Sequence, residues 1–339
     1  MAEILLHSVG PGVTVQDRGR TGYLAQGLSR GGAADLLALA EGAALLGQSE
    51  DLAVIEIAGS FVSIELTAPA RIALSGAPMR ANCDGAPLAW HSSHALAAGT
   101  RLNMSAGAGG YSYLHLGGGI ATDPVLGARS VHLASGLGRM LQEGDRLELG
   151  ADKGTRAGLT FTPLARFDGG ALRMVETPQT ILFPPDLRAR FTATRFHKDT
   201  RGNRMGQRLI QQGAGFELDA GLNILSEIIV PGDIQITGDG MPFVLLSECQ
   251  TTGGYPRIGT VLPCDLPRLV QAPPGCELWF SFVSLEDAIA LEQAEAQRRA
   301  GLRGALRPLV RDPHDIADLL AYQLVSGVTR GDELEGDAT

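Results

Sequence analysis

Short hydrophobic runs separated by polar and turn-forming residues dominate the chain. Four segments rich in β-branched, aromatic or leucine residues are bounded by glycine, proline or serine: 61–76, 111–120, 146–150 and 232–247. Runs of this kind are typical of β-strands. Helices of regular length do not separate them, which argues against a doubly wound α/β sheet. The pattern predicts a mainly β fold built from barrels, with a few peripheral helices.

Three of these helices are predicted from their ends. The first, over 34–47, has Asp35 as a candidate N-cap and a glycine at its end. The second, over 284–301, starts at Ser284 with capping-box spacing and ends in two arginines and a glycine. The third, over 312–327, opens with an aspartate followed by a proline. Caps of these types satisfy the free backbone groups at helix ends.

A weak internal repeat suggests that one barrel is duplicated. An Arg-Gly step is followed 26 residues later by a glutamate inside an apolar run, first at Arg30 and Glu56 and again at Arg201 and Glu227. An unpaired carboxylate is costly to bury, so each glutamate is predicted to lie in a strand interior and to pair with the arginine of its own repeat. Each is either a structural ion pair or a carboxylate for substrate or metal.

The repeat predicts three regions. Residues 1–160 form the first barrel half, residues 161–300 form the second, and residues 301–339 carry a C-terminal helix and a disordered acidic tail. The join falls in the low-signal stretch 150–190.

Composition and motif spacing argue against several classes of partner and binding site. The net charge of −9 and the lack of a basic run argue against a nucleic-acid partner. No signal segment and no apolar stretch of membrane-spanning length occurs, so no membrane association and a cytoplasmic location are expected.

The only lysines are Lys153 and Lys198, so the chain has neither a P-loop lysine nor a Met-Lys-Met site for covalent biotin. His91 and His94 face opposite sides of a strand and the cysteines lack C-x-x-C spacing, so no metal site is predicted.

The stretch SECQTTGGYPRIGT, residues 247–260, has unusual polar density between two apolar runs. It is either a long hairpin connection or a binding loop. As a binding loop it would offer amide, hydroxyl, backbone and guanidinium groups from Gln250, Thr251, Thr252, Gly253, Gly254, Tyr255 and Arg257.

Two further segments join glycines to arginines. Glycine lets a ligand approach the backbone, and arginine binds carboxylate or phosphate in a bidentate manner. The first, 10–23, contributes Gln16, Asp17 and Arg20, and the second, 202–208, contributes Asn203 and Arg204. A solvated loop is the alternative for both.

Four segments in order resemble one family. They are VQDRGRTGY (15–23), NRMGQRL (203–209), SE-x-x-VPG-x-IQ (226–235) and LLSECQTTGGYPRIGT (245–260). Together they resemble the family of allophanate hydrolase subunit 2 and its 5-oxoprolinase relatives, which is carboxyltransferase-like. The resemblance implies tandem cyclophilin-like β-barrels. Two positions depart from the expected pattern, since Cys249 stands where an arginine is expected and Ala34 where a methionine is expected.

The resemblance also implies a function. The first expectation is a subunit of an ATP-dependent 5-oxoprolinase, acting with a homologue of the first subunit and with an amidohydrolase. ATP with Mg²⁺ would be used by the complex, with Glu227, Gln250 and Arg257 as candidate catalytic residues. One alternative is half of a biotin-dependent carboxyltransferase acting on urea or a similar amide. Another is a non-catalytic regulatory protein that binds its homologous partner.

Overall fold

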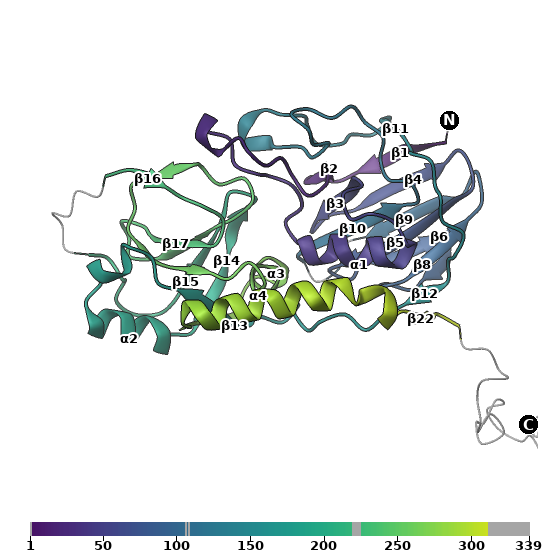
Figure 1. The fold of residues 1–339 in the computed structure, drawn as a ribbon. Helices are drawn as coiled ribbons and strands as arrows, with labels where there is room; N and C mark the ends of the chain where they lie inside the picture. The colour runs from purple at the N-terminus through teal and green to yellow at the C-terminus, as the bar shows by residue number, and fades with distance from the viewer. Residues whose placement is uncertain (1, 106, 108, 219–224, 311–339) are drawn as a thin grey trace, which may run out of the picture.

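The computed structural model describes residues 2–105, 107, 109–218 and 225–310 of the 339-residue chain. Figure 1 shows two β-rich halves side by side, with helix α4 (Leu285–Ala300) running beneath both. This helix packs against α1 of the first half and against β13 of the second. The predicted mainly β fold with few peripheral helices is confirmed.

The N-terminal half places its strands in two antiparallel sheets. The six-stranded sheet has the order β11 (Arg146–Glu148), β1 (Glu3–Val9), β4 (Val62–Leu66), β9 (Arg101–Ser105), β6 (Arg80–Cys83) and β7 (Ala86–Leu88). The five-stranded sheet has the order β2 (Val13–Gln16), β3 (Val54–Ala58), β10 (Tyr111–Leu116), β5 (Ala70–Gly76) and β8 (Ser93–Leu96). Their alternating apolar side chains share one hydrophobic core, to which Leu6 and Ile55 contribute.

The C-terminal half is a closed barrel. Its strand order is β13 (Gly170–Val175), β20 (Arg257–Val261), β17 (Asp233–Ile236), β18 (Pro242–Leu245), β15 (Gly206–Ile210), β14 (Phe196–Asn203) and β21 (Glu277–Phe282). Closure gives each of these strands a neighbour on both sides. A cluster of phenylalanines fills the core, with the rings of Phe191 and Phe280 stacked 5.1 Å apart.

Several short elements complete the fold. A two-residue strand pair, β16 (Glu227–Ile228) and β19 (Thr252–Gly253), lies outside the barrel. Near the C-terminal end of the described chain, β22 (Arg307–Pro308) returns to the first half and pairs with β12 (Leu159–Thr160). The remaining helices are α2 (Pro185–Ala193), α3 (Leu266–Gln271) and the 3-10 turns Leu24–Gln26, Leu133–Ser135, Thr180–Leu182 and Leu302–Ala305.

Two of the three predicted helices are confirmed. Helix α1 (Leu36–Leu46) is capped by Asp35, whose side chain accepts hydrogen bonds from the first-turn amides. Helix α4 is capped by Ser284, which accepts a hydrogen bond from Asp287 N. The third prediction, 312–327, lies outside the described residues.

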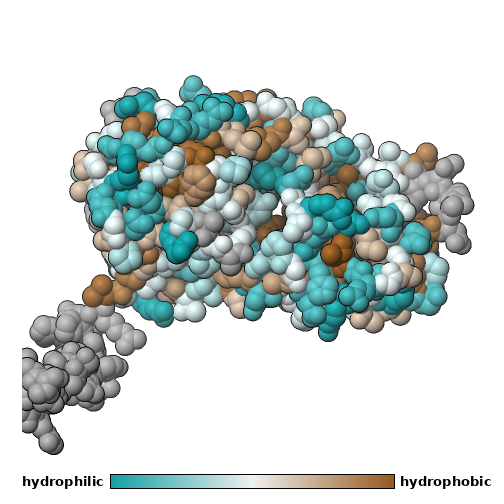
Figure 2. All heavy atoms as spheres, turned by 180° about the vertical axis from the view of Figure 1, so that it is seen from behind, coloured by the Kyte–Doolittle hydropathy of each residue, from teal (hydrophilic) through white to brown (hydrophobic). Residues whose placement is uncertain are grey.

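On the opposite face of the molecule, hydrophilic and hydrophobic residues are interspersed over both halves (Figure 2). Within the described ranges, no helix is both long and apolar enough to cross a membrane.

Candidate functional site

A buried glutamate of the N-terminal half faces the C-terminal barrel. Glu56 lies in the interior of β3, as predicted, and is 1% exposed. Its Oε2 accepts hydrogen bonds from Tyr113 Oη and from Ala34 N, each at 2.8 Å. The strand therefore presents a carboxylate whose second oxygen points to a partner from the other half.

That partner is Arg204, in the turn between β14 and β15. Its guanidinium donates hydrogen bonds to Glu56, to Gly32 O and, at 2.5 Å, to Glu248. Burial lowers the pKa of Arg204, but the two carboxylates outweigh burial and raise it above its ordinary value. A main-chain hydrogen bond of 2.9 Å from Gly31 N to Ser247 O joins the halves at the same place. One permanently charged arginine thus connects the two halves.

The ion pairs predicted from the repeat are wrong. Arg30 donates to Arg18 O at 2.8 Å and does not contact Glu56. Arg201 pairs with Asp199 at 2.7 Å, because the β14 strand places the two side chains next to each other. Equal sequence spacing does not determine which strand ends meet in space, and the β14–β15 turn brings Arg204 to Glu56 instead.

Glu227, unlike Glu56, is not in a strand interior. It lies in the short β16, and its side chain is 50% exposed. Arg257 donates to it at 2.6 Å and to the buried Asp233 at 3.1 Å, while Gln179 donates to it at 2.8 Å. Two predicted catalytic residues, Glu227 and Arg257, therefore do meet, but Arg257 also neutralises a buried aspartate inside the barrel.

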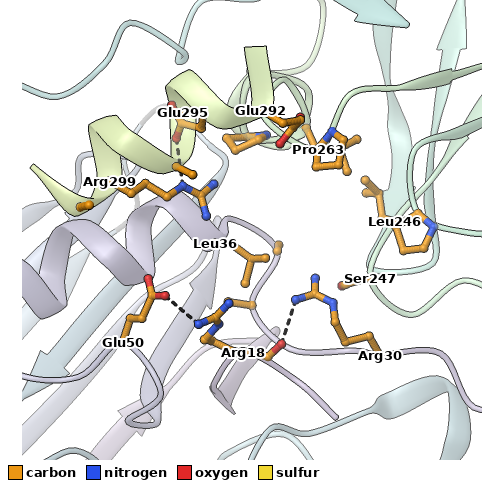
Figure 3. Close-up of a pocket in the computed structure, with 17 residues that line it drawn as sticks. Arg18, Arg30, Leu36, Glu50, Leu246, Ser247, Pro263, Glu292, Glu295 and Arg299 are labelled. Atoms are coloured by element: carbon orange, nitrogen blue, oxygen red, sulfur yellow. Dashed lines mark hydrogen bonds and ion pairs between the residues drawn. The ribbon is translucent and has the colours of Figure 1, made fainter. Parts of the chain in front are cut away.

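A cavity of about 510 Å³ lies between the two halves and α4. In Figure 3, Arg18 and Arg30 lie on the side opposite Glu295 and Arg299 of α4, with Leu246 and Ser247 on the barrel side. Arg18 pairs with Glu50 at 2.7 Å. Arg299 pairs with Glu295 at 2.9 Å. Both of these guanidinium groups are thus already neutralised.

Arg30 differs from these two arginines. Across the described residues, no carboxylate lies within ion-pair distance of Arg30, and its one hydrogen bond is to a main-chain carbonyl. Burial, followed by repulsion from Arg18 and Arg204, lowers its pKa below the ordinary value. An arginine charge without a counter-charge beside a cavity suits an anionic ligand, either a carboxylate or a phosphate. The predicted binding residue Arg30 is therefore well placed.

Most of the predicted binding loop lies elsewhere on the surface. Its first residue, Ser247, lines the interdomain cavity, whereas Gln250, Thr252, Gly254 and Tyr255 are exposed and do not line it. Gly253 pairs with Glu227 through the β16–β19 ladder. The start of the loop contacts the N-terminal half, because Ser247 O accepts a hydrogen bond from Gly31 N at 2.9 Å and Glu248 accepts one from Ala134 N at 3.1 Å.

Of the remaining predicted site residues, some are buried and one is exposed. Gln16, Asp17 and Arg20 are buried at the end of β2 and in the loop after it. Asp17 accepts hydrogen bonds from the amides of Gly19 and Arg129 at 2.8 and 2.6 Å. Asn203 is exposed, and its side chain caps the tight β14–β15 turn by accepting from Met205 N at 2.8 Å.

Sequence reasoning missed several members of the interface. Glu248 lies within the polar stretch 247–260. A glutamate next to the end of a buried strand was a signal from which its role could have been predicted. His132, by contrast, stands in an ordinary segment, and only the fold brings it within 3.9 Å of Glu248. Ser29 Oγ hydrogen-bonds the other ring nitrogen of His132 at 2.9 Å.

Across the described ranges, no three His, Cys, Asp or Glu side chains converge in a geometry that could hold an ion. The interface carboxylates Glu56 and Glu248 are instead bound by Arg204 and by main-chain amides. The donor set therefore fits an organic or inorganic anion better than it fits a resident metal.

Residues 26–282 match the family model of the carboxyltransferase domain, subdomain A and B. The chain belongs to this family. Within the family it is 33% identical over 294 residues to a 5-oxoprolinase subunit of Escherichia coli, with 83% of this chain and 91% of that protein covered. It is 27% identical over 325 residues to a putative urea carboxylase of Emericella nidulans, covering 88% of this chain and 25% of that protein.

Solved structures of similar proteins share the fold. The crystal structure of TTHA0988 superposes with a TM-score of 0.76 at 28% identity, covering 83% of this chain and 55% of that one. Urea carboxylase of Kluyveromyces lactis superposes with a TM-score of 0.78 at 22% identity, covering 92% of this chain and 31% of that one. The chain thus spans about half of the first structure and a third of the second.

Proposed function

We propose that this chain is a subunit of an ATP-dependent 5-oxoprolinase, which hydrolyses 5-oxo-L-proline to L-glutamate. The observation that carries the proposal is the 33% identity to the 5-oxoprolinase subunit of Escherichia coli, which extends over 91% of that protein. Because that relative is named as a subunit, action within a complex is part of the proposal. The proposed partners are a homologue of the first subunit and an amidohydrolase.

The interdomain cavity supplies the geometric support. Arg30 has no carboxylate counter-ion among the described residues and faces a space of about 510 Å³. It can bind the carboxylate of 5-oxoproline or a phosphate oxygen. A lactam is a sluggish electrophile, and ATP with Mg²⁺ would supply its activation by phosphorylation. The chain's own contribution is to bind and orient anionic groups, since the described lining of the cavity includes no cysteine or histidine.

The experiment is reconstitution of the three proteins with 5-oxoproline and ATP, measuring release of glutamate and ADP. The expected result is activity that needs all three proteins and that avidin does not inhibit. Replacing Arg30 with Ala should lower kcat/KM at least tenfold, which is about 1.4 kcal/mol of transition-state binding. The matched control is Arg139→Ala, since Arg139 is an exposed arginine whose pair with Asp145 lies on the surface. Full activity of Arg30→Ala would show that the substrate does not bind in this cavity.

A second candidate is half of a biotin-dependent carboxyltransferase. It is favoured by the 27% identity to the putative urea carboxylase over 88% of this chain. Biotin would be carried by another chain, because neither lysine of this one lies in a biotinylation motif. Avidin-sensitive consumption of urea and bicarbonate, without turnover of 5-oxoproline, would establish this candidate. Tight partner binding with neither activity would indicate a regulatory protein.

A further inference from the structure

The described lining of the interdomain cavity carries as many positive as negative side chains. They are Arg18, Arg30 and Arg299, and Glu50, Glu292 and Glu295. Two ion pairs, Arg18 with Glu50 and Arg299 with Glu295, neutralise two residues of each sign. One cation and one anion on the cavity wall, Arg30 and Glu292, are left over.

Glu292 is the anionic counterpart of Arg30. It lies on α4 and is half-buried. Its Oε1 accepts a hydrogen bond from Cys264 N at 2.8 Å, which orients the carboxylate. Across the part of the chain that the structure describes, no arginine, lysine or histidine lies within ion-pair distance of Glu292, and its Oε2 accepts no hydrogen bond. One carboxylate oxygen is therefore left for a ligand.

The two unpaired charges lie on opposite sides of the cavity. Figure 3 shows Glu292 on the side formed by α4 and Arg30 on the side formed by the segment before α1. Much of the remaining lining is apolar, with Leu36, Leu246 and Leu266 among its members. Apolar walls strengthen a charge–charge interaction relative to water, and a volume of about 510 Å³ is within the usual range for small-molecule sites.

The two charges together restrict the kind of ligand. A ligand that carries only negative charge would pair with Arg30 but would leave Glu292 without a counter-charge on the same cavity. A ligand with only a positive charge would leave Arg30 in that position. A molecule with both a carboxylate and an ammonium group provides a counter-charge for each side chain.

We infer that this cavity binds a free amino acid, with a carboxylate on Arg30 and the ammonium group on Glu292. The inference rests on the proposed function for the identity of the amino acid, which is then the product, L-glutamate. The ring nitrogen of 5-oxoproline is an uncharged amide, whereas the amine of glutamate is protonated at neutral pH. Glu292 therefore favours the product over the substrate, and L-glutamate should inhibit the complex in competition with 5-oxoproline.

The test measures binding to the purified full chain by ligand-observed NMR. L-Glutamate is compared with glutarate, which keeps both carboxylates and lacks only the ammonium group. The expected result is that the wild type binds L-glutamate at least tenfold more tightly than glutarate, with 5-oxoproline also weaker than L-glutamate.

Two variants assign the two charges. Glu292→Gln keeps an oxygen that can accept from Cys264 N but removes the negative charge, so it should abolish the preference for L-glutamate over glutarate. Arg30→Gln should weaken binding of both probes. The matched control is Glu286→Gln, since Glu286 is an exposed glutamate of the same helix that does not line the cavity, and the preference should persist in it. Melting temperatures of all three variants show that each remains folded.

Three results would overturn the inference. Equal affinity of the wild type for L-glutamate and glutarate would show that the ammonium group is not recognised. A preference that survives in folded Glu292→Gln would place the ammonium group elsewhere. Absence of L-glutamate binding to the wild type would show that this cavity does not hold a free amino acid.

The proposed function and this inference fail separately. If the reconstituted complex turns over urea and not 5-oxoproline while the preference for L-glutamate still depends on Glu292, the function fails and the amino-acid site stands. If the complex hydrolyses 5-oxoproline but the chain binds L-glutamate and glutarate equally, the site fails and the function stands.

Discussion

Arg204 of the C-terminal barrel donates a hydrogen bond to Glu56 of the N-terminal half in a place closed to solvent. The same guanidinium also donates to Glu248 and to Gly32 O. This one side chain therefore holds the Gly31–Gly32 turn of the N-terminal half against the C-terminal barrel. Arg30 precedes that turn and lines the cavity. The buried ion pair therefore holds the turn next to Arg30, the residue on which the proposed anion site depends.

Replacing Arg204 with Ala should destabilise the chain strongly. It would leave Glu56 and Glu248 buried without their shared counter-charge, and breaking a buried pair from one side costs about 3–5 kcal/mol. Urea unfolding measures the loss. The control is Arg146→Ala, which removes an exposed pair with Glu3 and should cost about 1 kcal/mol or less. A loss for Arg204→Ala as small as that of the control would show that the two halves do not depend on this arginine.

Gln250 and Arg257 should give different results although they are close together in the sequence. Gln250 is exposed, so Gln250→Ala should leave the melting temperature unchanged and any loss of activity would report on binding. Arg257→Ala leaves the buried Asp233 without its arginine and should cost about 3 kcal/mol or more.

Thermal melts and rates of the reconstituted complex on both variants separate the two roles. A third variant, Arg257→Lys, tests the role of the guanidinium group. Lysine keeps the positive charge but cannot donate to both Asp233 and Glu227 as the guanidinium does. An Arg257→Ala variant that melts like the wild type would contradict the structural role of this arginine.

Much of the fold follows from local patterns in the sequence. The run FVSIEL became β4 because its apolar side chains alternate and face one core. Helix α1 was predictable at both ends, since Asp35 caps the first turn and Gly47 ends the helix with a φ of 66°. Such signals act over a few residues, so they can be read without knowing the tertiary structure.

The site was less predictable because its contacts join distant segments. Arg204 and Glu56 are 148 positions apart. Arg20 meets Ser130 across 110 positions. No local pattern encodes such a pairing, and equal spacing from an arginine to a glutamate led to the wrong partners. Residue types were nevertheless informative, because Arg20, Arg30, Glu56 and Arg204 were all singled out and all lie at or beside the interface.

Stability should fall in mild acid through His115. Burial lowers the pKa of His115 to about 3, whereas the unfolded chain keeps the ordinary value of 6.5. Between these values the unfolded state binds the proton more strongly, so stability present above pH 6.5 is lost as the pH falls towards 3, by about 1.4 kcal/mol per unit. The measurement is the free energy of unfolding from about pH 7 to about pH 4 for the wild type and His115→Gln.

Taking the difference between these two proteins cancels the other titrating groups, including His91, whose pKa burial lowers to about 4. The wild type should lose more stability than His115→Gln over this range. Parallel curves would show that His115 does not contribute.

The last prediction concerns why helix α1 contains a glycine at position 42. A Cβ at Gly42 would lie 2.1 Å from His115 Nε2, closer than any real contact, and the ring is fixed by a hydrogen bond of 2.9 Å to Ser75 Oγ. Alanine normally stabilises a helix relative to glycine by about 1 kcal/mol. Gly42→Ala should nevertheless destabilise this protein, because the buried ring cannot move away. In a His115→Ala background, which removes the ring, the same Gly42→Ala change should become stabilising. Urea unfolding of the four proteins gives the coupling energy, and the same effect of Gly42→Ala in both backgrounds would refute the packing explanation.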